Sequence, residues 1–396
     1  MTDRKLRIGL VMQGDGNWVG GVEYIKNIIF ALATLPTEVK NTFEIILICH
    51  TELDPSLYSS IISEVTETIY ISKSNKFQRL QEELDKFIFN EYASALVRCL
   101  SNSSTGRLDF LYPHFSLRYG DYTGFPWIPD FQHKCLPLFF SKQIIADRDK
   151  YFNYLASNAQ NIVVSSESAK QDFERFYPDS QSELTVLSFA TFPLQQWYID
   201  DSEDVLQKYN LPSRFFLVSN QFWQHKNHTI IFEAVSILKQ QGLDVNLVCT
   251  GKIQDPRNPL YTEKLINKID NLGLSDRIYL LGLIPKIDQI QLVRQSLAMI
   301  QPSLFEGWST VVEDARCFGK QIAISNISVH LEQSPPKAKF FNPDQPQELA
   351  DILHQWWDEH KDGYDRDAEL AAYQENRSRI QALGSQFLGI AQKSLK

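Results

Sequence analysis

The residues best suited to chemistry in this sequence lie where a buried-strand pattern meets a helix pattern. Glu306 follows the strand-like run 298–303, and Ser309 and Thr310 come directly before the next helical pattern. Ser and Thr are typical of a helix N-terminus, whose N–H groups favour an anion. Asp314 lies one turn further along. Carboxylates beside a helix N-terminus suit a ligand that carries both hydroxyls and phosphates, and a nucleotide sugar is such a ligand.

Glu313, next to Asp314, has a structural interpretation. Thr310 and Glu313 have the Ser/Thr-x-x-Glu spacing of a capping box. In a capping box the Glu side chain reaches back to the backbone N–H of the capping residue. We therefore expect Glu313 to cap the helix, and Asp314 to accept hydrogen bonds from a ligand. N–H groups near Ser309 and Thr310 are expected to point outward at an anion.

Two further segments could contact phosphates. Lys226 follows the strand-like run 215–220 near the start of a helical pattern, where an ammonium group could meet a bound anion. A glycine-rich loop that ends in Gly20 and Gly21 also follows a strand and opens a helix. Its spacing is not GxGxxG, and no acidic residue ends the second strand, so a dinucleotide site is disfavoured. A tight turn explains this loop equally well.

Strand-like apolar runs that alternate with single helices predict a parallel sheet in each half of the chain. The fold class is therefore α/β, with two Rossmann-like, doubly wound domains on either side of a cleft, and ligands are expected beyond the carboxyl ends of the strands. The expected domains are an amino-terminal one on the acceptor side, a second one on the donor side and a helical end segment: residues 1–198, 199–370 and 371–396. Residues 51–130 are left without a detailed interpretation.

The segment 301–319 resembles the EX7E motif of the family 4 retaining glycosyltransferases, which have the GT-B fold. Glu306 stands at its first acidic position and Asp314 at its second. Other segments occur in the order typical of that family: 20–23, 127–133, 164–170, 220–228 and 282–285. The resemblance covers nearly the whole chain, and 301–319 is its most specific part.

The resemblance also implies a role for individual residues. Asp314 would hold the ribose hydroxyls of the donor, Glu306 would contact the transferred sugar, and Lys226 would neutralise the diphosphate. The remaining implied donor-site residues are backbone donors for the diphosphate and a turn residue against the base: Gly20, Gly21, Ser309, Thr310 and Ile284. The implied chemistry is front-face attack, in which the leaving phosphate oxygen accepts the acceptor's proton.

This chain departs from the family pattern in three places. Gln221 stands where the family often has Arg, so one positive charge on the diphosphate is missing. The second acidic residue is Asp314 in place of Glu. A His-Asp pair of many relatives reads Pro129-Asp130 here, with His133 nearby as a candidate substitute that could instead satisfy backbone groups.

Composition excludes several other classes of protein. The formal net charge is −9 and no stretch concentrates Lys and Arg, so a nucleic-acid partner is not expected. No signal peptide or membrane-spanning run is evident, which predicts a cytoplasmic protein and leaves peripheral contact with the membrane open. The triplets 147–149 and 365–367 imitate a DxD metal motif, but alternating charge on solvated helices explains them better. We expect neither a metal nor a cofactor, and interpret the five cysteines as reduced core residues.

Together with these observations, the resemblance implies a retaining, metal-independent hexosyltransferase. It would move a sugar from a UDP- or GDP-linked donor to a hydroxyl of a glycan or another acceptor, as in polysaccharide biosynthesis. A non-catalytic relative that binds a nucleotide or glycan is the main alternative, motivated by Gln221. An NAD(P)-dependent oxidoreductase is a weaker one. The sequence leaves the base, the sugar, the acceptor and the oligomeric state open.

Overall fold

The computed structural model describes residues 4–14, 18–71, 108–113, 123–199, 202–255, 257–360 and 363–393. The chain divides into two compact units. Unit 1 comprises Met1–Phe131, Lys142–Phe192 and Ser378–Lys396, and unit 2 comprises Gln132–Ser141 and Pro193–Arg377. The domain ranges expected from sequence stay a prediction, because compactness does not show which segments fold independently. Of the segment 51–130, which has no detailed interpretation from the sequence, residues 72–107 and 114–122 lie outside the described residues.

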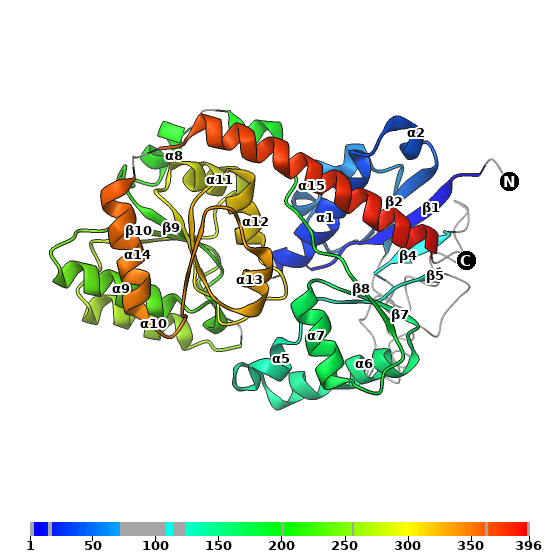
Figure 1. Cartoon of the computed structure of the whole chain (residues 1–396), viewed down its shortest axis with the longest axis horizontal. Coiled ribbons are helices and arrows are strands. Elements are labelled where there is room, and N and C mark those ends of the chain that lie inside the picture. The colour runs from blue at the N-terminus through cyan, green and yellow to red at the C-terminus, as the bar shows by residue number, and fades with distance from the viewer. Residues whose placement is uncertain are drawn as a thin grey trace. The chain divides into compact units, whose positions relative to one another are not determined.

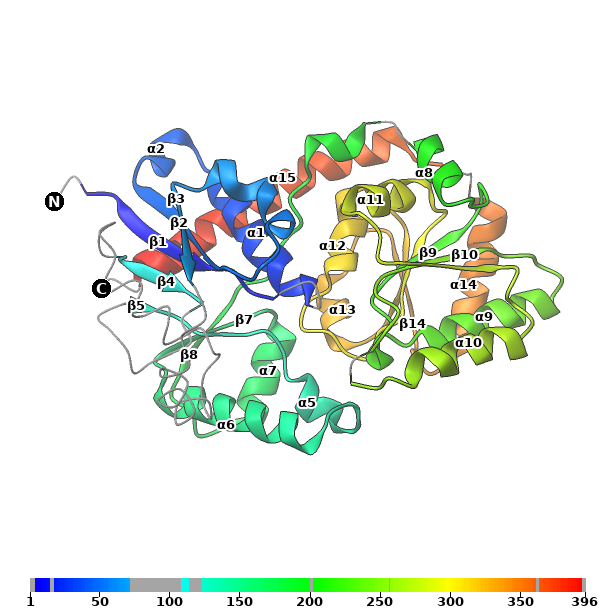
Figure 2. The ribbon, with the colours of Figure 1, turned by 180° about the vertical axis from the view of Figure 1, so that it is seen from behind.

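Unit 1 contains a five-stranded parallel sheet in the order β3-β2-β1-β4-β5 (Figures 1 and 2). Its strands are β1 (Leu6–Val11), β2 (Phe43–His50), β3 (Glu67–Ile71), β4 (Phe110–Tyr112) and β5 (Thr123–Gly124). Residues Leu6 to Val11 pair in register with Phe43 to Ile48. Helix α1 (Val19–Ala33) follows β1, and the short α2 (Thr37–Lys40) precedes β2. The order of strands 1 to 5 is that of a Rossmann-like sheet.

A second, three-stranded parallel sheet completes unit 1. Its order is β6-β7-β8, and its strands are β6 (Trp127–Ile128), β7 (Asn161–Val164) and β8 (Glu183–Val186). Helices α6 (Lys142–Asn158) and α7 (Glu167–Phe176) precede β7 and β8. The side chain of Ser166 caps α7 by accepting a hydrogen bond from the Ala169 N–H at 2.9 Å, which fixes where this helix begins.

Unit 2 contains a six-stranded parallel sheet in the order β11-β10-β9-β12-β13-β14. Its strands are β9 (Phe216–Ser219), β10 (Leu247–Thr250), β11 (Ile278–Gly282), β12 (Met299–Gln301), β13 (Ile322–Ser325) and β14 (Ala338–Phe341). The helices are α8 (Ser202–Lys208), α9 (His228–Gln240), α10 (Tyr261–Asn271), α11 (Lys286–Gln295), α12 (Thr310–Cys317), α13 (Ser328–Gln333) and α14 (Pro346–Glu359). Strand order reverses between β9 and β12, as in a Rossmann fold.

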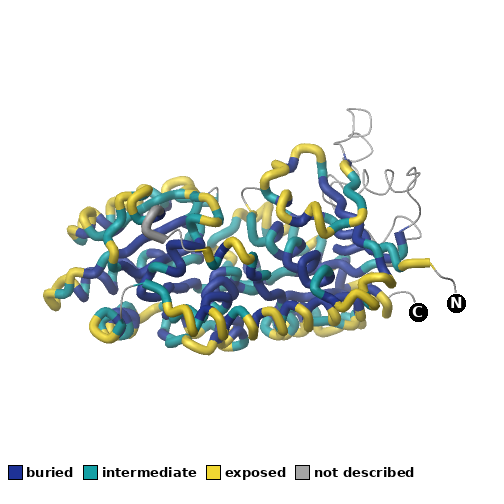
Figure 3. The backbone as a smooth tube through the Cα atoms, turned by 90° about the horizontal axis from the view of Figure 1, so that it is seen from above, coloured by how far each residue is buried: buried dark blue, intermediate teal, exposed yellow. Residues whose placement is uncertain are grey.

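Helices cover both faces of the unit 2 sheet (Figure 2), so its strands are buried on both sides. Phe216 and Ile300 belong to one apolar cluster, whereas their neighbours Leu217 and Met299 belong to the other. Successive side chains of a strand point to opposite faces, so a strand buried on both faces must be apolar throughout. In each unit the buried stretches lie inside and the exposed ones outside (Figure 3).

The sixth strand, β14, lacks this pattern and was not expected from the sequence. It lies at the sheet edge and is only partly buried except at Phe341. The last of the chain's passages from one unit to the other falls within helix α15 (Arg366–Lys393), between Arg377 and Ser378. Among the described residues, no helix is long and apolar enough to span a membrane.

Candidate functional site

The candidate site of unit 2 is built where its strand order reverses, between β9 and β12. Asn220 follows β9 and Gln301 ends β12, and the Asn220 Nδ2 donates a hydrogen bond to Gln301 Oε1 at 2.6 Å. Both side chains are buried. Ligands of doubly wound sheets bind beyond the carboxyl ends of the strands at such a reversal. The Asn220–Gln301 bond therefore joins the two segments that lead to the predicted donor-site residues.

Gln301 orients the carboxylate of Glu306. Its Nε2 lies within hydrogen-bonding distance of Glu306 Oε1 at 2.9 Å, of Ser309 Oγ at 3.0 Å and of Ser303 Oγ at 3.2 Å. The Ser303 hydroxyl also donates to Glu306 Oε1, at 2.6 Å. Gln301 and Ser303 were not predicted from sequence, although both stand at a strand end beside an acidic residue.

Lys226 completes this cluster. Its Nζ lies 2.6 Å from Glu306 Oε1, and the two side chains are only 15% and 9% exposed. Asn227, in the left-handed conformation with φ 53°, precedes α9 and turns the chain directly after Lys226. The structure thus brings together two residues that are 80 positions apart and that the sequence had assigned to one ligand. Each hydrogen bond that Glu306 accepts from a described residue ends on Oε1, which leaves Oε2 for a ligand.

Asp314 forms a second ion pair. Its Oδ2 lies 2.6 Å from Lys286 Nζ, with side-chain exposures of 3% for Asp314 and 35% for Lys286. Lys286 was missed in the sequence, but it is the first residue of α11 and follows the predicted 282–285 turn. Ile284, in that turn, is half-buried against the apolar cluster of this face. Asp314 and Lys286 therefore present one charge of each sign on adjoining helices.

The N-terminus of α12 differs from the prediction. The helix begins at Thr310 with Ser309 as the capping residue, so the expected Thr310–Glu313 capping box is wrong: Glu313 is one position too far along. Glu313 is fully buried, and its Oε1 accepts a hydrogen bond from Gln333 Nε2 at 3.1 Å. Helix α13 supplies this Gln333, which the sequence pattern around α12 could not indicate.

Gln333 also accepts a hydrogen bond from the Ser309 N–H, which was expected to point at an anion. The Ser309 N–H donates to Gln333 Oε1 at 3.0 Å, and Gln333 Nε2 donates to the Ser309 carbonyl at 3.1 Å. Ser309 itself is buried. In this structure the outward donor expected at Ser309 is therefore engaged by protein, and Gln333 holds the segment before α12 in place.

Gln221 lies in a region of close backbone approach. Gly251, which follows β10, has φ +127°, and a Cβ there would lie 2.2 Å from the carbonyl oxygen of Asn220 and 2.8 Å from the backbone N of Gln221. Such distances exclude a side chain at this position. The glycine lets the segments after β9 and β10 touch, which fixes the backbone at Asn220.

Two buried histidines adjoin Lys226. Burial and the positive charge of Lys226 lower the pKa of His228 to about 3 and hold the pKa of His225 well below its usual value. The ring of His228 stacks on Phe222 at 4.1 Å. Both imidazoles are therefore neutral near pH 7 and add no charge that would compete with Lys226 for an anion.

Gly20 and Gly21 lie inside a helix and not in the loop before it. Helix α1 begins at Val19, so Gly20 and Gly21 are in its first turn, where backbone N–H groups have no partner within the helix. A Cβ on Gly21 would lie 3.0 Å from the indole of Trp18. That indole stacks on Trp127 at 5.9 Å. Packing of Trp18 is thus a structural reason for glycine here, independent of any phosphate.

Asp130 and His133 have different surroundings. Asp130 Oδ1 accepts a hydrogen bond from Arg148 Nη2 at 2.7 Å, an ion pair within unit 1. His133 lies on the short helix α5 (Gln132–Cys135), in the segment grouped with unit 2, and it is fully buried. Arg148 belongs to the triplet 147–149, so this DxD-like triplet lies on helix α6 and supplies a partner for Asp130.

The other chemistry-bearing residues have structural roles. The side chain of Asp365 accepts a hydrogen bond from the Ala368 N–H at 3.0 Å at the start of α15. Cys49, Cys249 and Cys317 are buried free thiols, and Cys135 is half-buried, whereas Cys99 lies outside the described residues. Within the described part of the chain, no group of three or more His, Cys, Asp or Glu residues could hold a metal ion.

Comparison with solved structures identifies the fold of this chain. A glycosyltransferase of Rickettsia africae covers 99% of this chain and 99% of its own, with a TM-score of 0.67 and 17% identity. The Anabaena protein Alr3699/HepE, solved in complex with UDP, covers 98% of this chain and 100% of its own, with a TM-score of 0.67 and 15% identity. The chain has the GT-B fold.

The matches found by sequence cover a smaller part of the chain than the structural ones. Residues 201–377 match the family model described as glycosyl transferases group 1. The serotype-specific mannosyltransferase WbdA of Escherichia coli is 24% identical over 231 residues, which is 56% of this chain and 28% of WbdA. The chain thus spans little more than a quarter of the length of this curated relative. Residues 201–377, which match the family model, contain the candidate site of unit 2.

Proposed function

We propose that this protein is a retaining glycosyltransferase that moves a hexose from a nucleoside diphosphate sugar to an acceptor hydroxyl. The observation that carries the proposal is the Lys226–Glu306 pair at the strand-order reversal of unit 2, held by Gln301. The match of this unit to glycosyl transferases group 1 supports the reaction class. The UDP complex of a protein with the same fold supports a nucleotide donor.

In this proposal Lys226 stabilises the departing diphosphate as it gains negative charge. An ammonium group has three donors. One is directed to Glu306 Oε1, so two can reach phosphate oxygens without breaking the ion pair. Preorganised donors of this kind act where charge develops in the transition state and are a large source of catalysis. Glu306 Oε2 would accept a hydroxyl of the transferred sugar.

Asp314 would accept the ribose hydroxyls of the donor, with Lys286 orienting the carboxylate. Ile284 would pack against the base. Backbone N–H groups at Gly20 and Gly21, with Thr310, would add to the diphosphate contacts. We further propose that no metal takes part and that Asp130 and His133 have roles near the transferred sugar. The His133 side chain is fully buried, which a structural role also explains, so this assignment is the one to test first.

The acceptor is proposed to be a glycan hydroxyl in polysaccharide biosynthesis. The similarity to WbdA, described as a serotype-specific mannosyltransferase, supports the transfer of a sugar. Retention would follow from front-face attack, in which the leaving phosphate oxygen takes the acceptor's proton. No described side chain is assigned as a nucleophile.

A thermal-shift series with UDP, GDP, ADP, UDP-glucose, GDP-mannose and NAD tests the donor. A ligand at about 100 times its Kd adds roughly 2.7 kcal/mol to the free energy of unfolding, an effect that melting detects. We expect one nucleoside diphosphate and its sugar to stabilise the wild type and not Asp314→Asn. Sugar transfer is then followed by NMR with EDTA present, and the anomeric configuration of the product reports retention. A shift with NAD alone contradicts the proposal.

A non-catalytic nucleotide- or glycan-binding protein is the second candidate, because Gln221 stands where relatives often carry Arg. It predicts a thermal shift with a nucleotide sugar but no hydrolysis or transfer. Gln221→Arg separates the two cases: a catalyst short of one charge gains activity, whereas a binding protein gains only affinity.

A further inference from the structure

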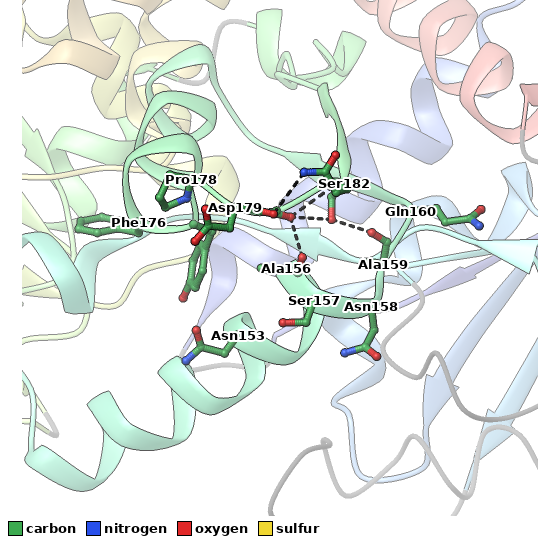
Figure 4. Close-up of a pocket in the computed structure, with 13 residues that line it drawn as sticks. Asn153, Ala156, Ser157, Asn158, Ala159, Gln160, Phe176, Pro178, Asp179 and Ser182 are labelled. Carbon is green, nitrogen blue, oxygen red and sulfur yellow. Dashed lines mark hydrogen bonds between the residues drawn. The ribbon is translucent and has the colours of Figure 1, made fainter.

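A pocket of about 490 Å³ lies in unit 1, at the edge of the β6-β7-β8 sheet where β7 and β8 begin (Figure 4). Its walls are the last turn of α6, the last turn of α7 and the segments that lead into β7 and β8. The lining residues are Asn153, Ala156–Gln160 and Phe176–Ser182. Substrates of such sheets bind beyond the carboxyl ends of the strands, whereas this pocket lies at the amino ends of β7 and β8. The pocket is therefore separate from the donor-site residues discussed above.

The floor of this pocket is fixed by short hydrogen bonds. The Ser180 hydroxyl donates to the Ala156 carbonyl, and the Ser182 hydroxyl donates to the Ala159 carbonyl, both at 2.6 Å. The Glu183 N–H donates to the Gln160 carbonyl at 2.7 Å. These bonds tie the segments before β7 and β8 together, so the pocket is formed without a ligand and costs little to organise.

The rim carries polar side chains that are available to a ligand. Asn153, Ser157, Gln160 and Asp179 line the pocket, and their side chains make no hydrogen bond with any described residue. Two are amides, which offer both donors and acceptors, one is a hydroxyl and one a carboxylate acceptor. Phe176 adds an aromatic ring to the wall. Such a set matches adjacent hydroxyls on a ring that also has an apolar face.

The charge of the pocket excludes an anion. Its 13 lining residues include Asp179 and no Lys, Arg or His. Helices α6 and α7 both end here, and a helix C-terminus carries partial negative charge. A phosphate or carboxylate would find no cation among the lining residues, and the guanidinium of Arg175, which stacks on Phe176, is already paired with Asp172. With one carboxylate against several neutral groups, the lining favours an uncharged polyhydroxyl ligand over a cation.

From this geometry we infer that the pocket is a binding site for an uncharged oligosaccharide. The inference rests on the lining residues alone and holds whichever reaction unit 2 performs. Its volume lies within the range of about 300 to 1,000 Å³ typical of ligand sites. For an enzyme that modifies a glycan, a second site of this kind would hold the chain nearby and raise the effective concentration of its end.

The test uses the full chain and four neutral trisaccharides: maltotriose, mannotriose, cellotriose and chitotriose. Saturation-transfer difference NMR measures their binding, with spermidine as a cationic probe. We expect at least one trisaccharide to bind the wild type. Gln160→Ala should weaken it by about fivefold through loss of one or two hydrogen bonds. Ser157→Trp should abolish it by filling the pocket, and Gln171→Ala, an exposed glutamine on α7 outside the pocket, should not change it.

Three results would overturn the inference: no binding of any of the trisaccharides, binding that Ser157→Trp leaves intact, or binding of spermidine alone that Asp179→Asn removes. Asp179→Asn keeps a hydrogen-bonding group without the charge, so oligosaccharide binding should survive it. The thermal shift with nucleotide is measured on each variant. If it persists while oligosaccharide binding is lost, the pocket and the donor site are independent.

Discussion

At the scale of single residues, the orientation of each proposed donor-site side chain depends on its partners more than on its own type. Glu306 is held by Gln301, Ser303 and Lys226 through one oxygen, so its orientation is fixed before a ligand arrives. Adjacent Glu313 and Asp314 are both buried, yet one contacts Gln333 and the other Lys286. Their different partners give them different expected roles.

Glu313 and Asp314 should respond differently to substitution. Glu313→Ala leaves a buried Gln333 amide without its carboxylate partner, and we expect the free energy of unfolding to fall by about 1–3 kcal/mol. The thermal shift with nucleotide should persist. Asp314→Asn should lose that shift. Urea unfolding and melting with and without nucleotide measure both effects, and loss of the shift in Glu313→Ala alone would reverse the assignment.

The Lys226–Glu306 pair should be coupled. Both side chains are nearly buried, and hydrogen bonds to charged groups contribute about 1.5–3 kcal/mol. In a double-mutant cycle with Lys226→Met and Glu306→Gln, we expect a coupling energy of about 1–3 kcal/mol from urea unfolding. Effects that add within about 0.5 kcal/mol would show that the two side chains act independently.

At the scale of elements, the candidate site depends on where strands end and how closely the following segments approach. Gly251 allows the segment after β10 to touch Asn220, whose side chain bridges to β12. Gln333, at the end of α13, holds the start of α12. The site is thus assembled from the ends of at least four elements, none of which contains it alone.

Gly251→Ala should disturb this assembly. A Cβ at Gly251 would lie 2.2 Å from the Asn220 carbonyl, so backbone must move, and we expect loss of the nucleotide-induced shift with a cost of roughly 2 kcal/mol or more. Gly242→Ala is the control: φ is +82° but nothing lies within 4 Å, so only about 1–2 kcal/mol of backbone strain is expected. Equal nucleotide responses in the two variants would contradict this account.

At the scale of the whole molecule, stability should depend on pH through buried histidines. Burial lowers the pKa of His330 to about 4, and its Nδ1 lies 3.0 Å from both the hydroxyl and the carbonyl of Ser325. The unfolded chain, with a pKa near the ordinary value, binds a proton first as pH falls. Stability from keeping His330 neutral is therefore complete above about pH 6.5 and is lost between about 6.5 and 4.

Replacing His330 should reduce this pH dependence. Between pH 7.5 and 5 we expect wild-type stability to fall by about 2 kcal/mol more than that of His330→Gln, measured by urea unfolding. His354→Gln, with a side chain 45% exposed, should retain the wild-type dependence. An unchanged pH dependence in His330→Gln would show that other groups control acid unfolding.

The sequence by itself determined that each half of the chain has a parallel α/β structure, because strands buried on both faces must be apolar throughout and were followed by helical patterns. It did not show that unit 1 contains two separate sheets. It also marked Lys226, Glu306 and Asp314, since strand ends in such sheets meet at one edge. It missed edge strand β14, whose half-buried residues lack that pattern.

Only the tertiary structure decided which residues hold the candidate site together. Gln301, Lys286 and Gln333 are ordinary in sequence and become partners only when distant strand and helix ends meet. The structure likewise replaced the expected Glu313 cap by a contact with α13, because a helix start is set by backbone geometry at Ser309 and not by spacing alone. Side-chain partners separated by many residues depend on packing, which local patterns do not encode.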